Sequence, residues 1–194
     1  MTAIEFYFDY RSPFSYLAFT QLRGLGAEVS LHPFDILDLM KRVGNVPTSI
    51  LCAPKGRYLR SDLARWVKRY GVAFERNPQL MSIDARRLLR ATLAAGAGGD
   101  MAAAAGAIYS AAWGKPQPLG SPAEVAQVLS AAGLNGADLE PLIDSAGMDE
   151  ALEAATSAAA ERGVFGAPTF FIGEDMFFGN DRFDFIRERL GAAP

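Results

Sequence analysis

The stretch IEFYFDYRSPFSYLAF, residues 4–19, decides the fold, because a strand pattern gives way within it to the start of a helix. Ile4, Phe6 and Phe8 alternate along one face, which predicts a strand near residues 3–9. Ser12 is followed by a proline, and that pair is a helix-start signal: serine caps free amide groups and proline fits the first helical turn. A helix is therefore predicted from about residue 13 to residue 25.

The position of the Ser12 hydroxyl allows two interpretations. A serine at a helix start often serves only to cap the helix. A helix N-terminus at the carboxyl end of a strand also favours negative charge, so the hydroxyl could instead face an anion. These residues alone leave both interpretations open.

The rest of the sheet is predicted near residue 30 and at the end of the chain. AEVSLHPFDI, residues 27–36, predicts a second strand over 28–34. VFGAPTFFIGEDMFFGNDRFDFIRERL, residues 164–190, predicts strands at 169–172 and 176–178 around a turn, then a helix at 183–190. With a right-handed crossover between the first two strands, the predicted fold class is α/β, a thioredoxin-like domain (βαβ…ββα) interrupted by a large all-helical insertion. We expect residues 1–35 plus 164–194 to form the thioredoxin-like domain and residues 36–163 the helical insertion domain.

Nearly all of the insertion has helical patterning. A stripe of apolar residues in RSDLARWVKRYG predicts a helix that ends at Gly71, and Ser82 precedes another apolar helix. SPAE, residues 121–124, is a capping box with proline at the first helical position. Further helices are predicted over residues 100–113, 138–145 and 149–162.

Composition narrows the class of protein. Half of the 194 residues are hydrophobic, yet no apolar run reaches the ~18 residues of a membrane span, and the N-terminus lacks a signal-peptide pattern. The single cysteine, Cys52, excludes an intrachain disulfide and favours a reducing compartment, so a cytoplasmic location is predicted. With one histidine, His32, and one cysteine, a structural zinc site of the usual kind cannot form, and no metal is predicted.

Charge is unevenly distributed along the chain. Residues 55–90 hold ten basic against three acidic residues, so this segment carries +7 and the remainder −10. Such a segment can form solvated helix faces or attract an anionic ligand. The overall charge of −3 and the absence of zinc-finger, RNP or KH patterns argue against nucleic acid.

Five motifs in order give a specific resemblance. FYFDYRSPFSYLAF, GNVP, YLRSDLARW, VFGAPTFFIG and FFGNDR extend from residue 6 to residue 182. Together they resemble the 2-hydroxychromene-2-carboxylate isomerase family, which is of the kappa glutathione-transferase type with a DsbA-like thioredoxin fold. SPFS stands where redox members of the fold have C-P-x-C, and because a hydroxyl cannot form a mixed disulfide, disulfide exchange is not expected.

The resemblance implies that glutathione is the cofactor and that the thioredoxin-like domain binds it. Ser12 is then the catalytic residue, donating a hydrogen bond to the glutathione thiolate. Pro168 is the cis-proline, and the main chain of Ala167 binds the cysteinyl backbone of glutathione. Asn180, Asp181 and Arg182 bind its γ-glutamyl end, although Asp181 can equally be the cap of the last helix.

The substrate side departs from the family pattern. Asn45 in GNVP is kept, and the resemblance places it beside the substrate. The naphthalene-pathway isomerase has an Asn-Arg pair against the substrate carboxylate, whereas Ser49 and Ile50 stand at the nearest positions here. We expect Lys55 or Arg57 to replace that pair.

The function implied is a glutathione-dependent isomerase that interconverts 2-hydroxychromene-2-carboxylate and trans-o-hydroxybenzylidenepyruvate in aromatic hydrocarbon catabolism. The expected partner is a small aromatic carboxylate, with no nucleic acid and no membrane, and family members suggest a homodimer. The alternatives are a kappa-type transferase or peroxidase acting on another electrophile, and a glutathione-binding protein without turnover.

Overall fold

The computed structural model describes residues 3–80 and 82–191. At residues 49 and 50, which are helical, it describes the main chain only. In this part of the chain four strands form one mixed sheet in the order β2-β1-β3-β4. Parallel pairing joins β1 (Ile4–Phe8) to β2 (Val29–Pro33). Antiparallel pairing joins β1 to β3 (Thr169–Ile172) and β3 to β4 (Asp175–Phe178). The predicted parallel pairing of the first two strands and the predicted antiparallel hairpin are confirmed.

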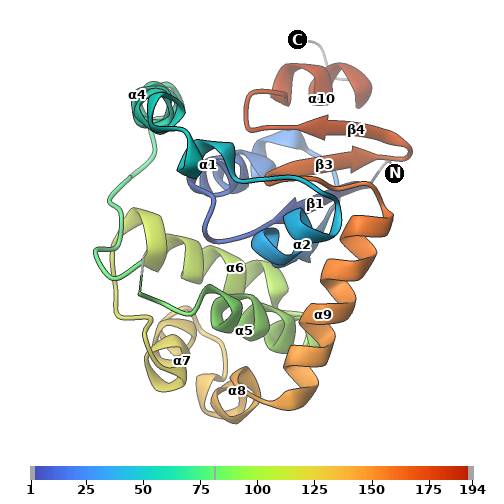
Figure 1. The fold of residues 1–194 in the computed structure, drawn as a ribbon. Helices are drawn as coiled ribbons and strands as arrows, with labels where there is room; N and C mark the ends of the chain where they lie inside the picture. Colours follow the sequence, from blue (N-terminus) through green and yellow to red (C-terminus); the bar gives the residue numbers. More distant parts are fainter. Residues whose placement is uncertain (1–2, 81, 192–194) are drawn as a thin grey trace.

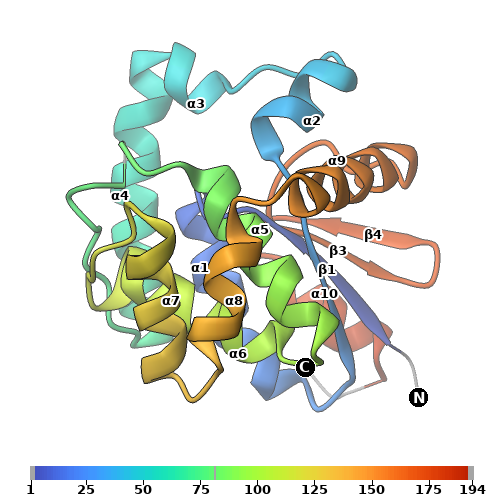
Figure 2. The ribbon, with the colours of Figure 1, turned by 90° about the horizontal axis from the view of Figure 1, so that it is seen from below.

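Helices α2 to α9 all stand between β2 and β3 in the chain. Figure 1 shows the sheet near the top, helices α5 to α8 gathered below it, and α9 leading back to β3. In Figure 2, which is seen from below, α2, α3 and α4 extend across one side of the molecule. The division at residues 36–163 stays a prediction. The helix bounds are α1 (Pro13–Gln21), α2 (Ile36–Arg42), α3 (Thr48–Leu51), α4 (Ala53–Tyr70), α5 (Ala85–Ala97), α6 (Met101–Tyr109), α7 (Pro122–Ala131), α8 (Gly136–Ile143), α9 (Ala146–Glu161) and α10 (Phe183–Arg189).

Apolar clusters cover both faces of the sheet. Alternate residues of the central strands point to opposite faces and so belong to different clusters. Phe6 and Phe170 face the large apolar cluster that includes residues of α1, α5, α6 and α10. Tyr7 and Phe171 face a smaller cluster, completed by Phe34, by α2 and by the end of α9. The carboxyl end of β1 and the start of α1 therefore lie between two layers of helices.

Local signals located most helix ends. Gly71 adopts the left-handed conformation (φ 63°) that ends α4, and the capping box at the start of α7 forms as predicted, with Ser121 and Glu124 each accepting a main-chain amide. Several predicted boundaries were wrong. The helices predicted from residues 138 and 149 begin earlier, at Gly136 and Ala146. The helix expected after Ser82 begins at Ala85, because the Asp84 carboxylate caps it. The helix predicted over residues 100–113 ends as α-helix at Tyr109, and a π-helical turn, Ser110–Gly114, follows.

The first helix is also shorter than predicted. It ends at Gln21, and a 3₁₀ turn, Leu22–Leu25, completes the predicted span. Within the described ranges, no helix has both the length and the apolar character required to cross a membrane.

Candidate active site

Ser12 and the loop before β3 lie against each other, although 155 residues separate them in the chain. The Ser12 Oγ atom accepts a hydrogen bond from the Ser15 amide at 3.1 Å, which caps α1, and donates one to the Ala167 carbonyl at 3.1 Å. The peptide bond between Ala167 and Pro168 is cis, which confirms the predicted cis-proline. The strand end, the helix start and the cis-proline loop thus meet at one hydroxyl.

This arrangement places a polar hydrogen at the positive end of a helix. Pro13 occupies the first turn of α1, so its missing amide hydrogen costs no hydrogen bond there. The aligned peptide dipoles of α1 give this end of the helix a partial positive charge that favours an anion. A hydroxyl hydrogen can rotate to a new acceptor without moving the main chain. Ser12 can therefore serve as a cap and as a donor to an anion.

The loop before α10 is joined to the cis-proline loop. The Gly179 amide donates to the Pro168 carbonyl at 2.9 Å. Asn180 is buried, its carbonyl accepts a hydrogen bond from the Tyr70 hydroxyl of α4 at 2.6 Å, and its side-chain Nδ2 has no partner within residues 3–80 and 82–191. Burial raises the pKa of Tyr70 above its ordinary value, so this hydroxyl stays a donor at neutral pH.

Asp181 and Arg182 are partly exposed and pair with each other at 2.9 Å. The structure assigns the cap position of α10 to Arg182, and in the described part of the chain no side chain caps this helix. The alternative that Asp181 serves as the cap is therefore wrong by one residue. Its carboxylate extends from the loop toward solvent, where it is accessible to a cation.

Asn45 reaches the same region from the other side. Its Nδ2 atom donates to the Phe165 carbonyl at 2.8 Å, two residues before Ala167, and its Oδ1 atom accepts the Val46 amide at 2.8 Å. The Phe165 ring packs against Phe178, with 4.7 Å between ring centroids. Asn45 thus lies beside the cis-proline loop, and in the structure its amide group tethers that loop.

A hollow of about 540 Å³ lies between α1 and the first half of α4. It is lined by Phe14, Pro54, Lys55, Tyr58, Leu59 and Asp62. Phe14 is two residues from Ser12, so the hollow is close to the hydroxyl along the same helix. Lys55 belongs to the lining, whereas Arg57 is exposed on α4 outside it. Ser49 and Ile50 lie in α3, but their side chains are outside the described residues.

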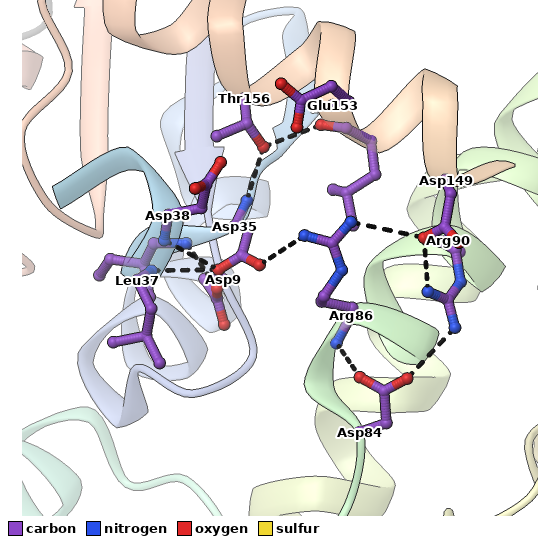
Figure 3. Close-up of polar contacts among 12 residues, drawn as sticks. Asp9, Asp35, Leu37, Asp38, Asp84, Arg86, Arg90, Asp149, Glu153 and Thr156 are labelled. Atoms are coloured by element: carbon purple, nitrogen blue, oxygen red, sulfur yellow. Dashed lines mark hydrogen bonds and ion pairs between the residues drawn. The ribbon is translucent and has the colours of Figure 1, made fainter. Parts of the chain in front are cut away.

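The predicted basic segment divides into two parts. Arg86, Arg87 and Arg90 of α5 form ion pairs with aspartates, so they are neither a solvated face nor free to bind a ligand. Figure 3 shows Arg86 between Asp35 and Asp149, with Arg90 on the far side of Asp149. The other cationic side chains of the segment, those of α4 and Arg76 in the loop after it, are exposed.

Sequence reasoning missed a buried acidic pair beneath Ser12. Asp9 is fully buried and Asp35 nearly so, and the Arg11 guanidinium lies between their carboxylates at 3.2 and 2.9 Å. Burial raises the pKa of Asp9 above its ordinary value, against the opposing effects of Arg11 and the Ile36 amide. One signal was available: an aspartate that directly follows an apolar strand and stands three residues before the candidate hydroxyl.

The remaining reactive side chains lie apart from this region or are already engaged. His32 stacks on Tyr7 with 4.6 Å between ring centroids, and burial lowers its pKa. Cys52 is half-buried at the junction of α3 and α4. Among the described residues, no three His, Cys, Asp or Glu side chains are grouped so that they could hold a metal ion.

Fold and site together define a thioredoxin-fold protein with a serine hydroxyl at the start of α1, against a cis-proline loop. The DSBA-like thioredoxin domain matches residues 3–191. The chain belongs to the DSBA-like thioredoxin domain family and, within it, to the family of 2-hydroxychromene-2-carboxylate isomerases.

Sequence and structural comparisons agree on that family. The chain is 33% identical to the 2-hydroxychromene-2-carboxylate isomerase of Pseudomonas sp. (strain C18), covering 98% of this chain and 91% of the relative, and 34% identical to that of Sphingobium xenophagum, covering 96% and 97%. A solved 2-hydroxychromene-2-carboxylate isomerase superposes with a TM-score of 0.85 at 32% identity, covering 97% and 94%. Glutathione S-transferase kappa 1 of Caenorhabditis elegans is 26% identical, covering 96% and 90%.

Proposed function

We propose that this protein is a glutathione-dependent isomerase of 2-hydroxychromene-2-carboxylate or a similar aromatic carboxylate. The observation that carries the proposal is the contact of the Ser12 hydroxyl, at the start of α1, with the loop of cis-Pro168. The names of the isomerase relatives support the reaction class, and the kappa transferase relative supports glutathione.

The groups around Ser12 fit a peptide that bears a thiol, an ammonium group and carboxylates. Ser12 supplies a hydroxyl donor, and the main chain of Ala167 supplies peptide groups for an extended ligand. The Asn180 Nδ2 atom has no partner in the described residues but is shielded from solvent, so the loop would have to open for it to donate to a ligand carboxylate. Asp181 is accessible to an ammonium group and Arg182 to a carboxylate. Together these residues would hold glutathione in the orientation that brings its sulfur to Ser12.

Bound glutathione would supply a nucleophilic sulfur, whose addition to a conjugated double bond permits rotation before elimination. Ser12 would donate its hydroxyl hydrogen to the sulfur anion in place of the Ala167 carbonyl. The amides at the start of α1 add electrostatic stabilisation of negative charge, which lowers the pKa of a thiol placed there. Phe14 and Tyr58 would bound the aromatic part of the substrate, and Lys55 would attract its carboxylate.

Two alternatives use the same site. A kappa-type transferase or peroxidase would direct the thiolate at a different electrophile, and a binding protein would hold glutathione without turnover. Reduced glutathione should bind one to one per chain in calorimetry, and 2-hydroxychromene-2-carboxylate should isomerise only when glutathione is present. Product formed from haloaromatics or hydroperoxides but not from the chromene would favour the transferase, whereas binding without any product would leave a binding protein. The absence of heat and of a thermal shift at millimolar glutathione would refute the proposal.

We also propose that the protein is a cytoplasmic homodimer. The edge strand β4 and helix α10 carry exposed apolar side chains, Met176, Phe178 and Phe185, which bound a surface hollow of about 560 Å³ with Arg182 and Glu188 beside them. Charges of both signs make this surface compatible with a second copy of itself. Light scattering at micromolar concentration tests the dimer, and fluorescent fusion in cells tests the location.

A further inference from the structure

The buried carboxylate of Asp9 holds the turn that carries Ser12. Asp9 directly follows β1, and its main-chain carbonyl accepts the Ser12 amide at 3.1 Å. Its Oδ1 atom accepts the Arg11 amide at 2.8 Å and the Arg11 Nε at 3.2 Å. Its Oδ2 atom accepts the Ile36 amide of α2 at 2.9 Å. Within the described residues, all the donors to this carboxylate are N–H groups, so these hydrogen bonds favour its ionised form, whereas burial raises its pKa.

Asp35 extends these contacts into the helical layer. Its Oδ1 atom accepts Arg11 Nη2 at 2.9 Å, its Oδ2 atom accepts Arg86 Nη1 at 3.0 Å, and its own amide donates to Thr156 of α9 at 3.0 Å. Figure 3 shows the Asp35 side chain directed toward Arg86 of α5 while its amide faces Thr156. Arg11, one residue before Ser12, is therefore fixed on both sides by carboxylates.

Stability alone does not account for a buried carboxylate at this position. Taking a carboxylate out of water costs several kcal/mol, and well-packed apolar residues often replace buried ion pairs without loss of stability. What an apolar residue cannot do is hold the Arg11 and Ile36 amides in one fixed direction. The Asp9 carboxylate accepts both of these amides. The turn that it fixes ends at Ser12, which carries the candidate catalytic hydroxyl.

We propose that Asp9 is a positioning residue for Ser12, whose buried carboxylate fixes the turn from residue 9 to residue 12 and so the direction of the Ser12 hydroxyl. The inference rests on the proposed function, because it assigns Ser12 the sulfur-binding role. Asp35 supports the same turn through Arg11. Neither aspartate is assigned contact with substrate.

The test is a double-mutant cycle of Asp9→Asn with Ser12→Ala, measured by turnover. An asparagine has one acceptor oxygen where the carboxylate has two, so it must lose a bond to Arg11 or to Ile36. Asp9→Asn alone should lower kcat by about 10- to 100-fold, because the donor to the thiolate is misdirected. In the Ser12→Ala background the same change should lower kcat by less than about threefold, since residues that act through one another are not additive. Equal losses in both backgrounds would overturn the proposal.

The pKa of the bound glutathione thiol gives a readout that a merely structural role would not move in the same direction. Removing the negative charge of Asp9 should by itself lower the thiol pKa, whereas misdirecting Ser12 should raise it. We expect a rise, measured by thiolate absorbance against pH, and a fall or no change would contradict the proposal. The control is Asp149→Asn, the same substitution at a half-exposed carboxylate that also pairs with Arg86, which should leave kcat and thiol pKa unchanged.

Two further variants keep the test decisive. If Asp9→Asn does not fold, as judged by circular dichroism, Asp35→Asn removes the second support of Arg11 and should give the same rise in thiol pKa. If wild-type protein does not bind glutathione, the proposed function fails, and a thiol introduced by Ser12→Cys in a Cys52→Ser background still reports on the turn. Its pKa, from the pH dependence of alkylation, should rise when Asp9→Asn is added. An unchanged value would overturn the role of Asp9 independently of glutathione.

Discussion

Replacing Ser12 by alanine separates its two possible roles. The Ser12 hydroxyl accepts the Ser15 amide and donates to the Ala167 carbonyl, both at 3.1 Å. Loss of a helix cap costs about 0.5–2 kcal/mol and loss of a neutral hydrogen bond about 0.5–1.5 kcal/mol. We therefore expect Ser12→Ala to lower the free energy of unfolding by about 1–3 kcal/mol. For a chain of this size that corresponds to a Tm lower by roughly 3–10 °C.

The catalytic consequence should be larger than the structural one. Removing one donor from an anion in a preorganised site typically costs about 10²-fold in rate. The pKa of the bound glutathione thiol should rise toward a free thiol's value, near ~8.5 or above. Glutathione affinity should change far less, because Ala167, Asn180 and Asp181 still hold the rest of the peptide. Thermal unfolding, calorimetry, turnover and thiolate absorbance against pH would be measured on the same preparation.

Ser15→Ala is the matched control. It is the same chemical change one turn later in α1, at a fully buried hydroxyl that has no hydrogen-bond partner in the described part of the chain. Because no bond is lost, stability should be unchanged or slightly higher, and turnover should stay within about twofold of wild type. If Ser12→Ala keeps wild-type turnover and an unaltered thiol pKa while losing stability, Ser12 is only a cap and the proposed mechanism is wrong.

Other substitutions test the hollow beside α4, the Cys52 thiol and the buried Asp35 carboxylate. Lys55→Met should raise KM for an aromatic carboxylate about tenfold with little change in kcat. Arg57→Met, on the same helix but outside the hollow, should leave KM unchanged. Equal effects of the two substitutions would contradict the assignment of the hollow as the substrate site. Alkylation of Cys52 should leave turnover within tenfold, and the protein should not reduce insulin disulfides, because a hydroxyl forms no mixed disulfide. Burial pushes the pKa of Asp35 upward, but Arg11 and neighbouring donors bring it below its ordinary value. Its ionised form therefore stabilises the fold above pH ~4, and this contribution is lost as pH falls through the lower folded-state pKa. Urea unfolding between pH 2 and pH 6 should show a shallower loss of stability in Asp35→Asn, and an identical pH profile would refute the assignment.

The sheet could be predicted from sequence because its signals are local. Alternating apolar residues marked β1, a short run of β-forming residues marked β3, and the Gly173 turn marked the hairpin that joins β3 to β4. Where two capping residues stood close together, sequence could not choose between them. Asp84 caps α5, while the Ser82 hydroxyl bonds back to the Gln79 carbonyl.

The buried charges beneath Ser12 could not be predicted in the same way. Asp35 and Arg86 are 51 residues apart, and their pairing depends on how α5 packs against the carboxyl end of the sheet. In the sequence Asp9 read only as the interruption of a strand. Ser12 carried a local signal, a Ser-Pro helix start, but its role and the cis form of Pro168 were implied only by the family resemblance of the motifs that contain them. The ion pair of Asp35 with Arg86 has no local sequence signal, because it forms only when the two distant segments pack together.

Three side chains of the helical insertion bind loops of the site through main-chain acceptors. Asn45 donates to the carbonyl of residue 165, Tyr70 to that of residue 180, and Trp113 to that of residue 10. A carbonyl is present whatever side chain the residue bears, so the tethers place no demand on the identity of residues 165 or 180. Variation at the exposed Phe165, which lies beside the cis-proline loop, can therefore alter what the site accepts while the loop keeps its position. Main-chain hydrogen bonds of this kind allow substrate preference to change by substitution at residue 165 while the fold around the site stays the same.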